Sequence, residues 1–244
     1  KGFDVRDQMT RYLRWYREGH LSSTGRCFDI GATTQNALAA FERTGNPYSG
    51  PTDSCTAGNG SLMRLAPVAL FFRRDPETAI QYAAESSRTT HGTRVAIDAC
   101  RYFAALLIGC LRKAKKEELL SIRYTPLPGY WDSHPLCEEI DSIARGSFKT
   151  KAPSQLPAGG YVVETLEAAL WAFHSTDCFQ EGCLKAVNLG NDADTTGAVY
   201  GQLAGAYYGR GEIPKSWIEP LALRDEIQSM ALKLYSVSTW PDVS

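Results

Sequence analysis

Four glycines recur at every fourth position in the stretch TTGAVYGQLAGAYYG, and this spacing restricts the fold more than any other feature. They are Gly197, Gly201, Gly205 and Gly209. On an α-helix this spacing gives one nearly straight stripe without side chains. Each glycine inside a helix costs about 1 kcal/mol relative to alanine, so the stripe needs a compensating contact. The sequence therefore predicts a buried central helix whose backbone a neighbouring helix approaches closely.

Apolar residues elsewhere in the chain also recur with the helical period. The predicted helices span residues 5–17, 33–43, 62–72, 76–87, 93–113, 136–144, 161–174, 179–189, 195–208 and 220–236. We find no convincing strand alternation and no polar linker long enough to divide the chain. The Pro- and Gly-rich stretch 151–160 (KAPSQLPAGG) is the best candidate for a mobile connector. We predict a single all-α domain over residues 1–244.

The composition argues against two classes of partner. With 26 basic and 27 acidic residues and a net charge of −1, the chain has no electrostatic footprint for nucleic acid or an anionic membrane. No apolar run approaches the roughly 18 residues of a membrane span. The seven cysteines are odd in number and contain no C-x-x-C pair, which favours a reduced, cytoplasmic protein.

An oxygen-rich cluster lies directly before the glycine-striped helix. It contains Asp192, Asp194 and Thr195 in the sequence NDADT. A helix N-cap would explain one of these residues but not three within four positions. Two crowded carboxylates repel each other unless a cation or protons intervene. Since Mg²⁺, Mn²⁺ and Ca²⁺ prefer such donors, the cluster predicts a metal site.

Four ordered motifs together carry a family resemblance. They are AGNGSLMRLAPVALF (57–71), TTHG (89–92), GGYVVETLEAALWAF (159–173) and GNDADTTGAVYGQLAGAYYG (190–209). In this order they resemble the ADP-ribosylglycohydrolase family, which includes dinitrogenase reductase-activating glycohydrolase. The resemblance covers essentially the whole chain.

The resemblance implies an all-α fold around a binuclear Mg²⁺ or Mn²⁺ centre. It also implies hydrolysis of the glycosidic bond that joins ADP-ribose to a protein side chain, most simply arginine, or to a small molecule. Asp192 and Asp194 would be catalytic residues and, with Thr195, metal ligands. The implied substrate-binding residues are Gly58, Asn59, Gly60, Ser61, Met63, His91 and Tyr161.

Each substrate residue also has a structural explanation when it is considered without the family. Residues 58–60 are typical of a tight turn, and Ser61 of a helix cap. His91 fits a helix C-terminus, and Tyr161 fits a core position with its hydroxyl satisfied. Only the cluster of Asp192, Asp194 and Thr195 favours a functional site without help from the resemblance.

The chain departs from the family pattern at its N-terminal side. The family's Thr-Asp-Asp motif and the Gly-Asp turn before it, which supply its other metal ligands, have no counterpart here. We therefore expect an N-terminally truncated family domain, a fragment of a longer enzyme that binds divalent metal weakly and hydrolyses poorly. The alternative is a non-catalytic ADP-ribose-binding or scaffold protein. Truncation is also expected to expose an apolar surface and to favour self-association.

Overall fold

The fold is entirely helical over residues 2–237, the part of the chain that this computed structural model describes. The all-α prediction is therefore confirmed. The longer helices are α1 (Val5–Glu18), α2 (Ala32–Thr44), α3 (Ala66–Phe71), α4 (Pro76–Arg88), α5 (Arg94–Leu111), α8 (Glu138–Ala144), α9 (Val162–His174), α10 (Phe179–Val187), α11 (Ala193–Tyr208) and α13 (Arg224–Val237). The shorter elements are α6 (Lys116–Leu119), α7 (Tyr130–Ser133), α12 (Lys215–Ile218) and the 3₁₀ turns Ser54–Thr56, Ser147–Thr150, Pro153–Gln155 and Arg210–Glu212.

Local capping chemistry fixes several helix starts. The Asp75 side chain accepts the Thr78 N–H at 3.1 Å, directly before α4, and Thr93 caps α5 in the same way. The predicted helix over 62–72 begins only at Ala66, because Pro67 is tolerated in a first turn but not in a helix interior. Residues 61–64 form turns instead, and Leu65 is the N-cap of α3.

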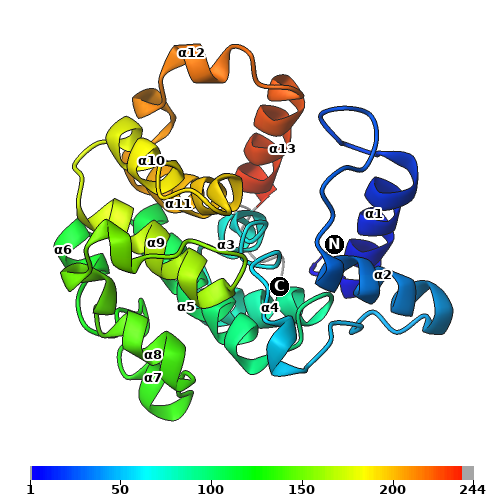
Figure 1. The fold of residues 1–244 in the computed structure, drawn as a ribbon, viewed down its shortest axis with the longest axis horizontal. Coiled ribbons are helices and arrows are strands. Elements are labelled where there is room, and N and C mark those ends of the chain that lie inside the picture. The colour runs from blue at the N-terminus through cyan, green and yellow to red at the C-terminus, as the bar shows by residue number, and fades with distance from the viewer. Residues whose placement is uncertain (1, 238–244) are drawn as a thin grey trace.

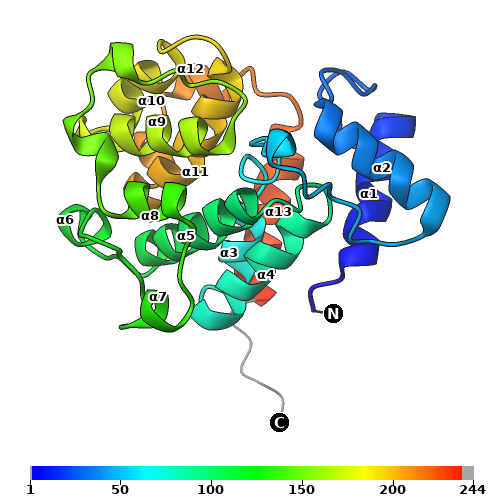
Figure 2. The same ribbon diagram turned by 60° about the horizontal axis from the view of Figure 1, so that its bottom comes forward.

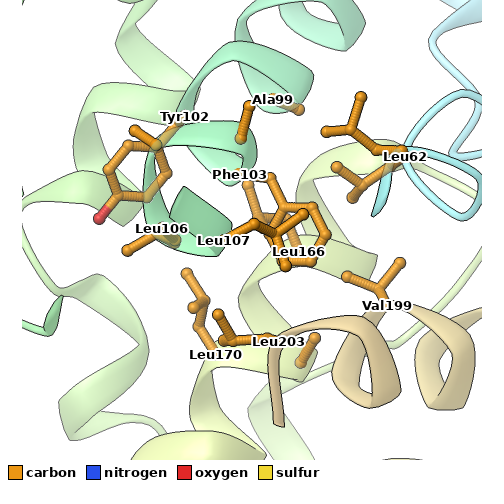
Figure 3. Packing of buried hydrophobic residues seen from close by; sticks show 14 of the residues in the cluster. Leu62, Ala99, Tyr102, Phe103, Leu106, Leu107, Leu166, Leu170, Val199 and Leu203 are labelled. Carbon is orange, nitrogen blue, oxygen red and sulfur yellow. The ribbon is translucent and has the colours of Figure 1, made fainter. Parts of the chain in front are cut away.

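Helix α5 is the centre of the hydrophobic core and packs against α3, α4, α8, α9 and α11 (Figure 1). Figure 3 shows Phe103 and Leu107 of α5 facing Leu166 of α9 and Val199 of α11. All four side chains are buried. Helix α11, which follows Asp192, thus packs on the most buried part of the molecule.

The glycine stripe of α11 behaves differently from the prediction. A methyl group at Gly197 would lie 2.9 Å from Val187 Cγ1, so the close approach exists there. At Gly201 and Gly205 an added methyl would meet nothing within 4 Å in the described part of the chain. The predicted helix contact is therefore wrong for these two glycines, and α5 rather than α11 is the central helix.

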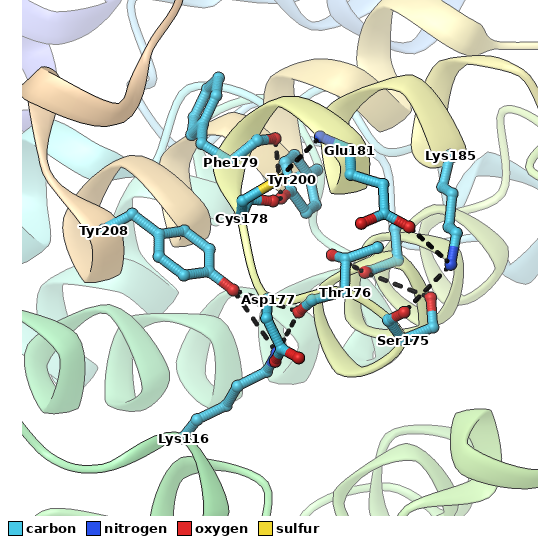
Figure 4. A network of polar contacts seen from close by, with 11 residues as sticks. Lys116, Ser175, Thr176, Asp177, Cys178, Phe179, Glu181, Lys185, Tyr200 and Tyr208 are labelled. Atoms are coloured by element: carbon cyan, nitrogen blue, oxygen red, sulfur yellow. Dashed lines mark hydrogen bonds and ion pairs between the residues drawn. The ribbon is translucent and has the colours of Figure 1, made fainter.

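Tyrosines in the middle and at the C-terminal end of α11 contact the connection between α9 and α10 and the start of α10 (Figure 4). The Tyr200 hydroxyl donates to Phe179 O at 3.0 Å, and the Tyr208 hydroxyl donates to Thr176 O at 3.2 Å. Lys116 also donates to Thr176 O. A side chain at Gly182 would collide with Tyr200, since its first carbon would lie 2.1 Å from the hydroxyl. These contacts hold the middle and the C-terminal end of α11 against the start of α10.

Helices α1 and α2 form a hairpin at one side of the molecule, apart from the α5 core (Figures 1 and 2). Its own small cluster contains Met9, Leu38 and Phe41. An ion pair between Arg17 and Glu42 also joins the two helices, at 2.7 Å. The hairpin is thus a thin second layer with its own apolar contact.

The predicted mobile connector, residues 151–160, is instead packed against the body. Leu156 and Ala158 are buried, and Ala158 O accepts the Asp192 N–H at 3.0 Å. Its prolines and glycines shape a fixed turn rather than a loose link. Within residues 2–237, no helix is both long enough and apolar enough to span a membrane.

Candidate active site

The loop at residues 57–63 is joined by backbone hydrogen bonds to the start of α9. Asn59 N donates to Gly160 O at 3.1 Å, and Val162 N donates to Ala57 O at 3.0 Å. These bonds form an isolated antiparallel bridge in an otherwise helical structure. Two of the sequence motifs, about 100 residues apart, therefore meet at one place.

The Asn59 side chain links this loop to the acidic cluster. Its amide nitrogen donates to Asp192 Oδ2 at 2.7 Å and to Thr165 Oγ1 at 2.8 Å. Asn59 is only 7% exposed; its bond to Thr165 is buried, and its bond to the partly exposed Asp192 is partly buried. The structure thus brings Asn59 and Asp192 together, which residue spacing alone does not predict.

The acids differ in their surroundings. Burial raises the pKa of Asp192, but hydrogen bonds, led by the one from Asn59, outweigh it and bring the pKa below its ordinary value. Asp194 is exposed, and Thr195 is buried at the first turn of α11. Asp192 is therefore a firmly held carboxylate, while Asp194 faces solvent.

These oxygen atoms fit part of the shell of one hard cation. The N-terminal end of α11 carries positive potential, so the negative charges of Asp192 and Asp194 are needed before a cation could bind there. Among residues 2–237, no group of three or more His, Cys, Asp or Glu side chains comes together to hold a metal. The remaining positions of an octahedral shell would fall to water, substrate or other residues.

Two residues in left-handed backbone conformations support Asp192. Ala158 has φ +48° and Asn191 has φ +52°, a region that non-glycine residues rarely adopt. The Asn191 side chain donates to Pro157 O at 2.5 Å, which ties the two strained segments together. Such strain is often stored at functional sites. Nothing in the sequence around Ala158 indicates this role.

His91 lies beneath the turn formed by Gly58 and Gly60. A methyl group at Gly60 would lie 2.9 Å from His91 Cε1, and one at Gly58 would lie 3.3 Å from Nε2. Burial and, to a smaller extent, the positive charge of Arg64 lower the pKa of His91 to about 3. The imidazole is therefore neutral, and the glycines are present because the ring occupies the space below them.

The other substrate residues predicted from the resemblance fall into two groups. The Ser61 hydroxyl faces inward, 2.9 Å from Ser87 Oγ, and is 1% exposed. Met63 and Tyr161 are exposed large side chains, at 39% and 38% respectively. Only the latter two present their side chains to solvent beside the loop.

The N-terminus of α2 also reaches this loop, and sequence reasoning did not assign it a role. Added methyl groups at Gly58 and Gly60 would lie 3.7 Å from Thr33 Oγ1 and 3.3 Å from Thr34 Oγ1. Gly31, the N-cap of α2, has no side chain to satisfy the first N–H groups. The stretch FDIGATT was the available signal, since a glycine N-cap with two threonines in the first turn of a helix suits an anion.

This all-helical fold is the fold of the ADP-ribosylglycohydrolase family. The model of the ADP-ribosylglycohydrolase family matches residues 1–242, and the chain belongs to this family.

Two curated relatives are named ADP-ribosylarginine hydrolase Tri1. The one from Pseudomonas putida (strain GB-1) is 40% identical over 96% of this chain and 60% of its own length. The one from Serratia proteamaculans (strain 568) is 36% identical over 95% of this chain and 61% of its own length. The ADP-ribosyl-[dinitrogen reductase] glycohydrolase of Rhodospirillum rubrum is 29% identical over 91% of this chain and 68% of its own length.

A solved structure titled "ADP-ribosylglycohydrolase-related protein complex" has the same fold. It superposes with a TM-score of 0.83 at 45% identity, over 98% of this chain and 76% of that one. The chain spans about three fifths of the length of the first two curated relatives.

Proposed function

We propose that this chain carries the ADP-ribose-binding loop and the acidic cluster of a hydrolase that removes ADP-ribose from arginine side chains of proteins. The carrying observation is the 2.7 Å hydrogen bond from Asn59 to Asp192, which joins the loop to the acids. The names of the two Tri1 relatives support arginine as the linkage.

The diphosphate of ADP-ribose would lie between the turn and the N-terminus of α2. Among the described residues, neither Gly60 nor Ser61 donates its N–H to a backbone carbonyl. Gly60 is partly exposed, so its N–H would be the one that meets an anion, whereas Ser61 is buried. Thr33 and Thr34 add hydroxyl groups close to Gly58 and Gly60. Converging N–H groups and a helix N-terminus form a typical phosphate site. Met63 and Tyr161 would cover the apolar faces of the ligand.

In the proposed reaction, the bond between ribose C1 and the guanidine nitrogen breaks and a water oxygen bonds to C1. The proton from that water passes to the Asp194 carboxylate and then to the leaving guanidine. Asp192, kept ionised by Asn59, stabilises positive charge on the sugar. Mg²⁺ or Mn²⁺ held by Asp192, Asp194 and Thr195 would orient the ribose hydroxyls and stabilise charge on oxygen.

The test combines binding with turnover. ADP-ribose and Mn²⁺ are titrated by calorimetry, and arginine release from ADP-ribosylarginine is followed with Mg²⁺ or Mn²⁺. Because three donors supply only part of a metal shell, we expect weak Mn²⁺ binding and slow turnover. Asp194→Asn should lower the rate by about 100-fold. The matched control is Asp132→Asn, an exposed acid on α7.

The outcomes separate the candidates. Wild-type protein that fails to bind ADP-ribose contradicts the proposal. Binding without turnover, under conditions where both metals were supplied, identifies a non-catalytic ADP-ribose-binding protein. Self-association, which we also propose for the exposed apolar face of α13, is checked by sedimentation of the same samples.

A further inference from the structure

Arg64 stands at the centre of a set of hydrogen bonds behind the turn. Its guanidinium donates to Gly60 O at 2.9 Å, to Thr90 Oγ1 at 2.7 Å and to Ser86 O at 3.1 Å. In the described part of the chain, Arg64 forms no ion pair with an acid. The Arg64 guanidinium thus binds backbone and hydroxyl oxygens around the turn rather than a carboxylate.

The contact with Thr90 has a consequence for His91. A guanidinium can only donate, so Thr90 Oγ1 accepts from Arg64 and its own proton remains free. The atom 2.8 Å away on the other side is His91 Nδ1. The hydroxyl finds an acceptor only if Nδ1 carries no proton. The ring proton of the neutral imidazole then lies on Nε2.

The position of Nε2 gives this tautomer its meaning. Nε2 lies beside Gly58, where the first carbon of a side chain would come within 3.3 Å of it. An Nε2–H donor is compatible with an oxygen of a sugar or a phosphate that lies beside Gly58 on the side of the turn where the ring lies. The opposite tautomer would present a lone pair to that oxygen and repel it.

We propose that Arg64 is the positioning residue of the ADP-ribose-binding turn. It fixes the Gly60 carbonyl directly and, through Thr90, holds His91 as the Nε2–H tautomer. The inference rests on the proposed function for the identity of the ligand. Its central claim, the relay from Arg64 to Thr90 to His91, concerns the free protein and can be measured without any ligand.

The experiment is nitrogen NMR of the protein labelled at histidine, with the His91 signals assigned by His91→Gln. Wild type should show protonated Nε2 and bare Nδ1. Thr90→Ser keeps the hydroxyl and should preserve this pattern. Thr90→Val is similar in shape but lacks the hydroxyl, so the preference for one tautomer should be lost. Arg64→Lys should have the same effect, because a single ammonium group cannot reach both Gly60 O and Thr90 Oγ1 as the branched guanidinium does.

Wild type and the three variants Thr90→Ser, Thr90→Val and Arg64→Lys are then titrated with ADP-ribose by calorimetry. Thr90→Val and Arg64→Lys should weaken binding about tenfold, as expected for a misplaced buried donor, while Thr90→Ser should bind like wild type. A purely structural role would lower thermal stability without changing the tautomer. If Arg64→Lys fails to fold, the pair Thr90→Val and Thr90→Ser decides the question.

Two results overturn the proposal. One is a wild-type His91 protonated on Nδ1, and the other is an unchanged tautomer in both Thr90→Val and Arg64→Lys. If wild type does not bind ADP-ribose at all, the proposed function fails. The NMR result then still supports or refutes the relay, so the two failures are distinguishable.

Discussion

The α5 body and the α1–α2 hairpin are stabilised in different ways. Helix α5 is buried along nearly all of its length and contacts helices on several sides. The hairpin buries only three apolar side chains fully enough to form a cluster. It is attached to the body by a Phe3–Tyr82 ring stack, a Gln8–Ser86 hydrogen bond of 2.7 Å and the Tyr12 ring under Arg64. The body depends on burial, and the hairpin depends on a few specific contacts.

This difference matters because both regions contribute to the candidate site. The acids and the start of α9 belong to the body, whereas Thr33 and Thr34 come from the hairpin. Regions with few buried contacts open at a lower free energy than the core does. One wall of the site is therefore expected to be more easily lost than the other.

The largest effect is expected in the body, for Phe103→Ala. Phe103 is 0% exposed, and removing its ring should lower the free energy of unfolding by about 4 kcal/mol. Urea unfolding followed by circular dichroism measures this value. Ile122→Ala, at a side chain that is 70% exposed, is the control and should change little. A loss below about 1 kcal/mol for Phe103→Ala would mean that the core repacks.

Met9→Ala tests the hairpin in the same way and should give a smaller, local effect. Met9 is fully buried, so a loss of about 2 kcal/mol is expected. Hydrogen exchange should show faster exchange in α1 and α2 with unchanged protection in α5. Equal loss of protection in α5 would show that the two regions unfold as one unit. It would contradict the view that the hairpin opens at a lower free energy than the α5 body. Leu21→Ala, at an exposed side chain, serves as control.

The segment that joins the two regions can be tested at Gly50. A methyl group there would lie 2.5 Å from His91 N and 2.7 Å from Arg88 O, which are backbone atoms. Gly50→Ala should therefore cost about 2 kcal/mol and disturb the turn above His91. Gly31→Ala, where an added methyl meets nothing within 4 Å, should be nearly neutral. Thermal unfolding of the two variants makes the comparison.

The smallest effect is a pH dependence confined to the hairpin. The hydrogen bond from Arg17 lowers the pKa of Glu42 below its ordinary value of 4.5. The contribution of the Arg17–Glu42 ion pair to stability is therefore fully present above the ordinary pKa of Glu42. It is lost as the pH falls through the lower pKa that Glu42 has in the folded protein. Protection factors of the α1 and α2 amides, which take out the intrinsic pH dependence of exchange, should fall over this range. The fall should be smaller in Glu42→Gln, and an identical pH profile of the protection factors in that variant would contradict the assignment.

Local signals in the sequence predicted the helices well, and long-range contacts explain what they missed. Asp75 and Thr93 mark helix starts because a cap acts within three residues. The glycine stripe predicted contact at Gly201 wrongly, because residue spacing defines a helix face but not its neighbour. Asp192 was identified from its own cluster, whereas its partner Asn59 is 133 positions away and was assigned only to substrate.

The Asn59–Asp192 hydrogen bond makes the two halves of the site thermodynamically linked. A cation that takes Asp192 Oδ2 must share it with the Asn59 amide or displace that amide, and Asn59 is part of the loop. If a bound cation changes the affinity of the loop for its ligand by some factor, the bound ligand must change the affinity for the cation by the same factor. If the chain binds both ligands as proposed, a metal titration with and without nucleotide and a nucleotide titration with and without metal must give the same coupling free energy.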